Sequence, residues 1–139
     1  MHAMAGRDYH FFISDAQGDS RIVEWDPKDE GRRMVATPVR EITNYYALYT
    51  DKVLPNQKND NLGHGKERAI AIADVLDAHD GFVTCDVAWE ALRAAAQDPN
   101  PEDVTSNTQR SIVYNNTDLT ADVCLRRNWD DVERFELNR

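Results

Sequence analysis

Apolar and polar residues in the first third of the chain follow the pattern of antiparallel strands. The runs at residues 9–14 and 21–25 are rich in aromatic and β-branched side chains. Gly18 lies in the connection between them, where a glycine can adopt the positive φ of a tight turn. The pattern predicts a hairpin here, then a strand at 33–37 and, beyond Pro38, a further extended segment at 39–44.

Residues 52–64 have no hydrophobic period and contain Pro55 and Gly63, and Gly65 follows directly. A loop of this length in a compact domain is usually functional or disordered. The sequence therefore predicts an aperiodic loop at this point.

Two helices are predicted in the middle of the chain. The first starts at Lys66 and ends at Gly81. The second begins after Thr84, its N-cap, and has Asp86 in its first turn. It ends at Asp98-Pro99. Both have apolar residues at the spacing of an amphipathic helix. These are Ala69, Ile72, Ala73 and Leu76 in the first helix, and Ala88, Ala91, Leu92 and Ala95 in the second.

Three more strands are predicted after the helices, at 109–115, 121–127 and 132–137, with a tight connection at 116–118. Strands on both sides of a helical pair indicate an α+β fold. We expect a mostly antiparallel sheet under one helical layer.

Composition narrows the function classes. The 139 residues fit one domain, and the net charge of −9 argues against a nucleic-acid partner. No apolar run is long enough for a membrane span. Two cysteines 39 positions apart indicate a reducing cytoplasm, and we expect residues 1–8 to be an expression scar or linker.

The histidines and cysteines offer little chemistry on spacing alone. No two histidines have metal-ligand spacing, so we expect no metal and no cofactor. Cys85 is interpreted either as a small residue in a first helical turn or as a reactive thiol paired with His64 or His79. Cys124, inside an apolar run, is predicted to be a core or sheet residue.

Two polar residues remain as candidates. Arg68 precedes Ile72 by four positions, so it shares the inward edge of the first helix. It either binds a carboxylate or carbonyl there or extends past the apolar stripe to water. Asn44 closes an extended segment and is either a turn former or a functional amide.

Several segments resemble the choloylglycine hydrolase and penicillin V acylase family. The hairpin from His10 to Ser20, with Val23-Glu24-Trp25, looks like that family's central strand pair. Ile42-Thr43-Asn44 is similar to its V-x-T-N segment, and residues 63–68 resemble its glycine-containing entry into a helix bearing an arginine. The segments 84–92, 111–115 and 131–137 resemble its next helix and last strands. The likeness runs from about residue 9 to 137.

The resemblance implies a hydrolase of linear amides with an N-terminal nucleophile, folded as an αββα sandwich of two stacked antiparallel sheets. In this family a cysteine that becomes the first residue attacks the amide, with its own α-amino group as base. Asn44 matches the family residue near the nucleophile and the oxyanion, and Arg68 matches the one that helps set the nucleophile's pKa and geometry. We therefore expect residues 9–139 to be the C-terminal portion of such a hydrolase domain, and the nucleophile belongs to the part that precedes it.

We therefore expect a chain that is inactive alone, whose intact parent binds a small-molecule amide. The alternative is a non-catalytic module that binds itself or a partner. Strand edges left open by a missing half favour association, so the expected state is a homo-oligomer.

Overall fold

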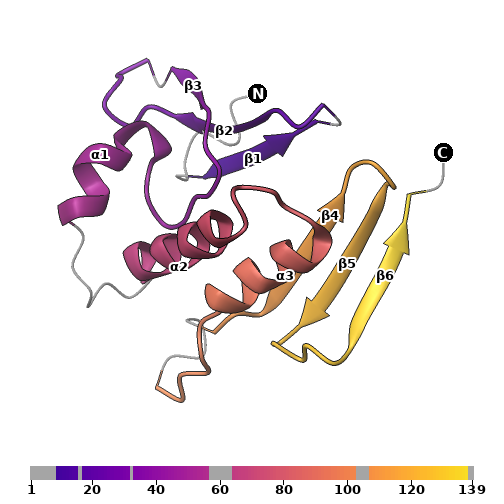
Figure 1. The fold of residues 1–139 in the computed structure, drawn as a ribbon. Helices are drawn as coiled ribbons and strands as arrows, with labels where there is room; N and C mark the ends of the chain where they lie inside the picture. The colour runs from indigo at the N-terminus through magenta and orange to yellow at the C-terminus, as the bar shows by residue number, and fades with distance from the viewer. Residues whose placement is uncertain (1–8, 16, 32, 57–63, 103–106, 138–139) are drawn as a thin grey trace. The chain divides into compact units, whose positions relative to one another are not determined.

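The computed structural model describes residues 9–15, 17–31, 33–56, 64–102 and 107–137, so the expected scar at 1–8 lies outside the described residues. The chain divides into two compact units, Met1–Gln57 and Lys58–Arg139, called here the N-terminal and C-terminal units. Each unit contains one three-stranded antiparallel sheet (Figure 1). The α+β class is confirmed, but the strands form two small sheets where the pattern predicted one.

The N-terminal sheet is a meander of β1 (His10–Ser14), β2 (Ser20–Trp25) and β3 (Met34–Thr37). The predicted hairpin is confirmed, with Ser14 opposite Ser20. Its turn is closed by the Asp15 carboxylate, which accepts the backbone N–H groups of Gln17 and Asp19 at 2.9 and 3.0 Å. Gly18 has the expected positive φ, 88°.

The predicted extended segment at 39–44 is not a strand, and that prediction is wrong. Pro38 follows the last residue of β3 and has no N–H to donate to a sheet. The chain leaves the sheet at this point, and the Ser20 hydroxyl donates to the carbonyl of Val39 at 3.1 Å. Residues 38–46 therefore form an irregular connection tied back to β2.

The loop predicted at 52–64 is partly helical. Three short turns follow one another, η1 (Ala47–Tyr49), α1 (Thr50–Val53) and η2 (Leu54–Asn56), so the loop prediction is wrong for residues 52–56. Local hydrogen bonds hold these turns, among them Thr50 Oγ1 to the Ala47 carbonyl at 2.9 Å. Bonds of this kind need no apolar period, so the hydrophobic pattern did not reveal them. Residues 57–63 lie outside the described part of the chain.

The C-terminal unit opens with the two predicted helices, α2 (Gly65–Ala78) and α3 (Cys85–Ala94). After α2, Gly81 has a φ of 73° and donates its N–H to the Leu76 carbonyl at 2.7 Å, the C-terminal geometry that favours glycine. Thr84 caps α3 as predicted, since its hydroxyl accepts the N–H of Val87 at 3.2 Å.

Helix α3 differs from its prediction at its end and on its buried face. It ends at Ala94, four residues before Asp98, because the chain leaves helical hydrogen bonding after its C-cap Ala95. Its buried positions, with its C-cap included, are Val87, Ala91 and Ala95, spaced by four, so the buried face is rotated slightly from the predicted stripe.

The C-terminal sheet consists of β4 (Arg110–Asn115), β5 (Thr120–Leu125) and β6 (Val132–Glu136). Strand β5 ends two residues earlier than predicted because Arg126 and Arg127 adopt positive φ values of 49° and 61°. Helix α3 packs along β4 (Figure 1). The sheet's buried positions, Ser111, Val113, Asp122 and Cys124, lie on one face according to the strand register.

Across the described ranges, no helix combines the length and apolar character needed to cross a bilayer.

Candidate functional site

Asn44 lies at the surface of the N-terminal unit. It is exposed, and its neighbours Thr43 and Tyr45 are both buried. The N–H of Tyr45 donates to the Thr43 carbonyl at 2.9 Å, which makes a tight local bend around Asn44. The structure therefore places the candidate amide on a bend, with its side chain accessible to solvent.

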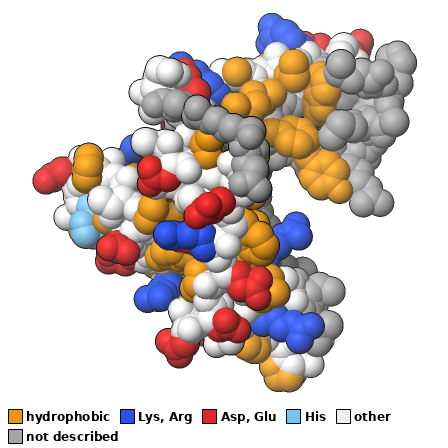
Figure 2. All heavy atoms as spheres, turned by 90° about the vertical axis from the view of Figure 1, so that its right-hand side faces the viewer, with side chains coloured by type: hydrophobic (Ala, Val, Ile, Leu, Met, Phe, Trp, Pro, Cys, Tyr) orange, Lys and Arg blue, Asp and Glu red, His pale blue; other side chains and the backbone are white. Residues whose placement is uncertain are grey.

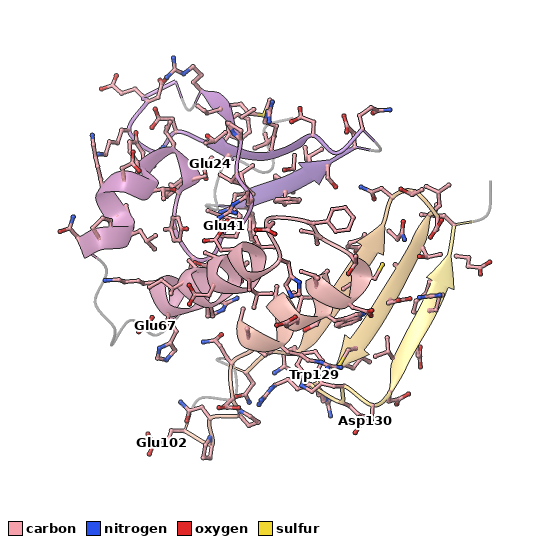
Figure 3. All side chains as sticks on the ribbon, viewed as in Figure 1. Glu24, Glu41, Glu67, Glu102, Trp129 and Asp130 are labelled. Atoms are coloured by element: carbon pink, nitrogen blue, oxygen red, sulfur yellow. The ribbon has the colours of Figure 1, made fainter. Side chains whose placement is uncertain are left out.

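Among the described residues of the N-terminal unit, the most buried charged group is Glu24, which sequence reasoning did not single out. Only 2% of this residue is exposed. Its carboxylate accepts the backbone N–H groups of Ala47 and Leu48 at 3.1 and 2.7 Å, and the Nδ1 atom of His10 lies 4.0 Å from it. Figure 3 shows Glu24 among the elements of this unit. Those N–H groups belong to the first two residues of η1, where no residue of the same turn can accept them. Glu24, a residue of β2, therefore caps the start of η1.

A second polar cluster joins the end of β2 to η1. The Tyr49 hydroxyl donates to Asp26 Oδ1 at 2.6 Å, and the N–H of Lys28 donates to the same oxygen at 2.9 Å. The ammonium of Lys28 lies 4.4 Å from the centre of the Tyr49 ring. The Tyr49 bond holds the pKa of Asp26 below its usual value, and the same bond raises the pKa of Tyr49 to about 12.

Arg68 lies in the first turns of α2 and is half-buried. Its Nε donates to the carbonyl of Ala95 at 3.1 Å. Burial lowers the pKa of the guanidinium, although an arginine stays protonated at ordinary pH. Of the two interpretations from sequence, the structure favours the one in which Arg68 binds a carbonyl.

Arg68 also contributes to a cavity in the C-terminal unit with a volume of about 460 Å³. The start of α2 forms one wall, and the residues after α3 form the other. The lining residues are His64, Glu67, Arg68, Ala71, Ala94, Ala96, Gln97, Asp98 and Asn100. A volume of this size lies in the lower range of small-ligand pockets. Asn44 is not among these residues and belongs to the other unit.

Neither His64 nor His79, the two histidines proposed as partners of Cys85, forms a hydrogen bond with that cysteine. His79 Nε2 lies 3.0 Å from Glu90, and the amide of Asn115 lies 3.7 Å from the sulfur of Cys85. His64 is exposed at the start of α2 with a φ of 45°. The contacts of the described residues bring no imidazole to Cys85, which favours the structural interpretation of that residue. Cys124 is fully buried in β5, as predicted.

The described residues hold no group of three or more His, Cys, Asp and Glu side chains that could ligate a metal ion. In comparisons with known proteins, no family model matches the chain, and no curated protein or solved structure matches it.

Proposed function

We propose that this chain is the C-terminal portion of a cytoplasmic cysteine-nucleophile hydrolase of linear amides, similar to choloylglycine hydrolases and penicillin V acylases. In this proposal the nucleophilic cysteine comes from a preceding segment of the intact protein. Asn44 and Arg68 have supporting roles, and the chain alone is inactive. The substrate is a small molecule with an amide bond.

The observation that supports the proposal most directly is the position of Arg68. A guanidinium that is half-buried at a cavity wall and fixed by the Ala95 carbonyl has little freedom to move. A cation held in this way can stabilise a thiolate or a developing oxyanion without reorganising at the moment of reaction. This is the role that the family resemblance implies for the matching arginine.

The sheets provide a second argument. On the side of the C-terminal sheet away from its buried residues, Tyr114 and Phe135 flank Ala121 in register, and their exposed fractions are 68% and 53%. On the N-terminal sheet, Phe11 is paired with Val23 and Trp25 with Met34 on the face opposite Glu24. Each sheet thus has its buried residues on one face and apolar side chains on the other, and a second layer against the apolar face would make a sandwich.

The proposal is tested by comparing this chain with the longer protein that contains it. Both are assayed on a glycine-conjugated bile salt, penicillin V and an N-acylated lactone. We expect turnover of at least one amide by the long form and none by the short form. Turnover by the short form would overturn the assignment, as would a long form that lacks an N-terminal cysteine.

Variants of the long form test the two supporting residues. Asn44→Ala is expected to lower kcat by about 100-fold if the amide stabilises an oxyanion. Arg68→Lys is expected to lower kcat/KM by about 100-fold, because it misplaces the charge. The matched controls Asn56→Ala and Arg110→Lys change the same residue types at exposed positions to which the proposal assigns no role. Equal losses in controls and test variants would contradict the assigned roles.

The exposed apolar side chains favour a second candidate function, a non-catalytic module that associates with copies of itself. Figure 2 shows such side chains at the surface, among acidic and basic ones. Strands β4 and β6 are the edges of their three-stranded sheet, and unpaired edges invite association. Analytical ultracentrifugation tests this: a dimer that becomes monomeric in Phe135→Glu but persists in Phe82→Glu supports it. A wild-type monomer excludes it.

A further inference from the structure

The C-terminal sheet presents different side chains on its two faces. The amide of Asn115 lies 3.7 Å from the sulfur of Cys85 at the start of α3, so the face that contains Asn115 is the one toward that helix (Figure 1). Side chains alternate between the two faces along each strand, so the register assigns each strand residue to one of them. The face away from α3, called here the outer face, has seven apolar positions: Ile112, Tyr114, Ala121, Val123, Leu125, Phe135 and, directly after β6, Leu137.

The outer face is large enough for a specific interface. Tyr114, Leu125, Phe135 and Leu137 are each more than half exposed, and the other three apolar residues are partly exposed. Together they offer about 500 Å² of apolar surface, so two such faces in contact would bury about 1,000 Å². Specific protein–protein interfaces begin near this size, and contiguous apolar patches of this extent often mark a binding surface.

Two charged residues of the outer face limit which partner fits. Arg110 lies on β4, one edge of the sheet, and Glu133 lies on β6, the other edge. Both are exposed, β5 separates them, and neither belongs to an ion pair of the described residues. The best partner therefore has a carboxylate opposite Arg110 and a cation opposite Glu133. A second copy of the same face, turned over, has both.

We infer that the outer face binds the outer face of a second copy of this chain, about a twofold axis parallel to β5. Such an axis places β4 of each copy over β6 of the other, because these two strands flank β5 on opposite sides. Arg110 then approaches Glu133 of the second copy. Tyr114 lies over Phe135 of the second copy, since both residues are level with Ala121 in the register. Ala121 is small and lies at the axis, where the two sheets approach each other.

A twofold axis perpendicular to the strands fits the same face less well. It places β4 over β4 and β6 over β6, so no carboxylate of the outer face comes opposite Arg110 and no cation comes opposite Glu133. Charges covered by an interface without a partner oppose association. The charges therefore favour the axis parallel to β5. This inference rests on the second candidate function, the self-associating module, and specifies its surface and its symmetry.

Sedimentation velocity of the full chain at about 1 to 200 µM measures the association. We expect a dimer with Kd about 10 µM, because the area is at the lower end for a specific interface. An ion pair at the rim adds little affinity, whereas like charges in the same place oppose binding, so the variants reverse charges. Arg110→Glu and Glu133→Arg each bring like charges together and are each expected to raise Kd about tenfold or more.

Mixing these two variants is the decisive measurement. In the mixed dimer both contacts again join opposite charges, so the mixture is expected to dimerise with Kd within about threefold of the wild type. Lys52→Glu and Glu136→Arg are the matched controls. They change the net charge by the same amounts at exposed positions outside the outer face, and each is expected to leave Kd within about threefold of the wild type.

The outcomes separate this inference from the function on which it rests. A wild-type dimer that persists in both reversal variants, or a mixture that stays as weak as its components, would overturn the outer-face pairing and leave self-association through another surface. Equal losses in the controls would do the same. A wild-type chain that is monomeric throughout would overturn both the pairing and the self-associating module, and would mean that another sheet or another protein covers this face.

Discussion

Arg68 of α2 and Ala95 at the end of α3 are joined by a side-chain hydrogen bond, in which Nε of Arg68 donates to the Ala95 carbonyl at 3.1 Å. Ala95 is the C-cap of α3, so its carbonyl is among those that no residue of the same helix satisfies. A cation at a helix C-terminus also interacts favourably with the helix dipole. One residue of α2 thus stabilises the end of α3.

Replacing Arg68 should therefore lower the free energy of unfolding of the C-terminal unit, even where no substrate is present. In Arg68→Lys the hydrogen bond from Nε is lost, and the free energy of unfolding is expected to fall by about 1 kcal/mol. Urea denaturation followed by circular dichroism measures this. The control Arg110→Lys, at an exposed position of β4, should stay within about 0.5 kcal/mol of the wild type. Identical midpoints for Arg68→Lys and wild type would show that the bond contributes nothing.

Glu24 is expected to be one of the most sensitive polar positions of the N-terminal unit. In Glu24→Gln one of the two acceptor oxygens becomes an amide group, so the N–H of Ala47 or Leu48 loses its acceptor. Leaving such a buried group unsatisfied costs about 1–3 kcal/mol. Amide hydrogen exchange at residues 47 and 48 should accelerate together with the loss of stability. Glu30→Gln, an exposed glutamate, is the matched control, and an equal effect there would contradict the capping role.

The bond between Tyr49 and Asp26 predicts an unusual alkaline titration. Tyrosinate absorbance at 295 nm should show one residue ionising near pH 12, because ionisation breaks the bond to Asp26. The folded pKa lies above the ordinary value of 10, so this bond stabilises the fold fully below pH 10, and its contribution is lost as the pH rises through 12.

Two substitutions test that assignment. Tyr49→Phe should remove the ionisation near pH 12 and let the pKa of Asp26 rise toward its usual value, because the hydroxyl is the main group lowering it. Tyr114→Phe changes an exposed tyrosine of β4 and should leave the step near pH 12 in place. Persistence of that step in Tyr49→Phe would assign it to another tyrosine.

Strands and helices were predictable where their signals are local. Three such signals each act within a few residues: the alternation around Ile22, the cap at Thr84 and the glycine at 81. The strand β2, the start of α3 and the end of α2 formed where these signals indicated. The segment 39–44 reads as extended for the same local reasons, but it leaves the sheet once Pro38 removes the next N–H. Propensity alone does not reveal which edge a strand can join.

The chemistry of the candidate site was less predictable because its partners are distant in sequence. The acceptors or donors for Glu24 and Arg68 are backbone groups 23 to 27 residues away, and backbone groups leave no residue-specific signal. A carboxylate at an inward strand position, two residues after Ile22, was the available hint for Glu24. Glu67 had no such hint, since the cavity exists only after α2 and the end of α3 come together.

Asp122 and Arg134 form a bidentate ion pair, with two hydrogen bonds of 2.7 Å across β5 and β6. The pair lowers the pKa of Asp122 and raises that of Arg134. Because the folded pKa of Asp122 is depressed, its stabilising effect is present above the unfolded value near 4 and is lost as the pH falls through the folded value.

Arg134→Gln should therefore lower the unfolding midpoint at pH 7, and the difference from wild type should shrink as the pH falls below about 4. Thermal unfolding between pH 2 and 7 measures this dependence. Glu133→Gln, on the neighbouring position of β6 and the opposite face, is the control and should leave the midpoint nearly unchanged. A difference between Arg134→Gln and wild type that stays constant down to pH 2 would mean that the arginine stabilises β6 by packing of its stem, not through the Asp122 carboxylate.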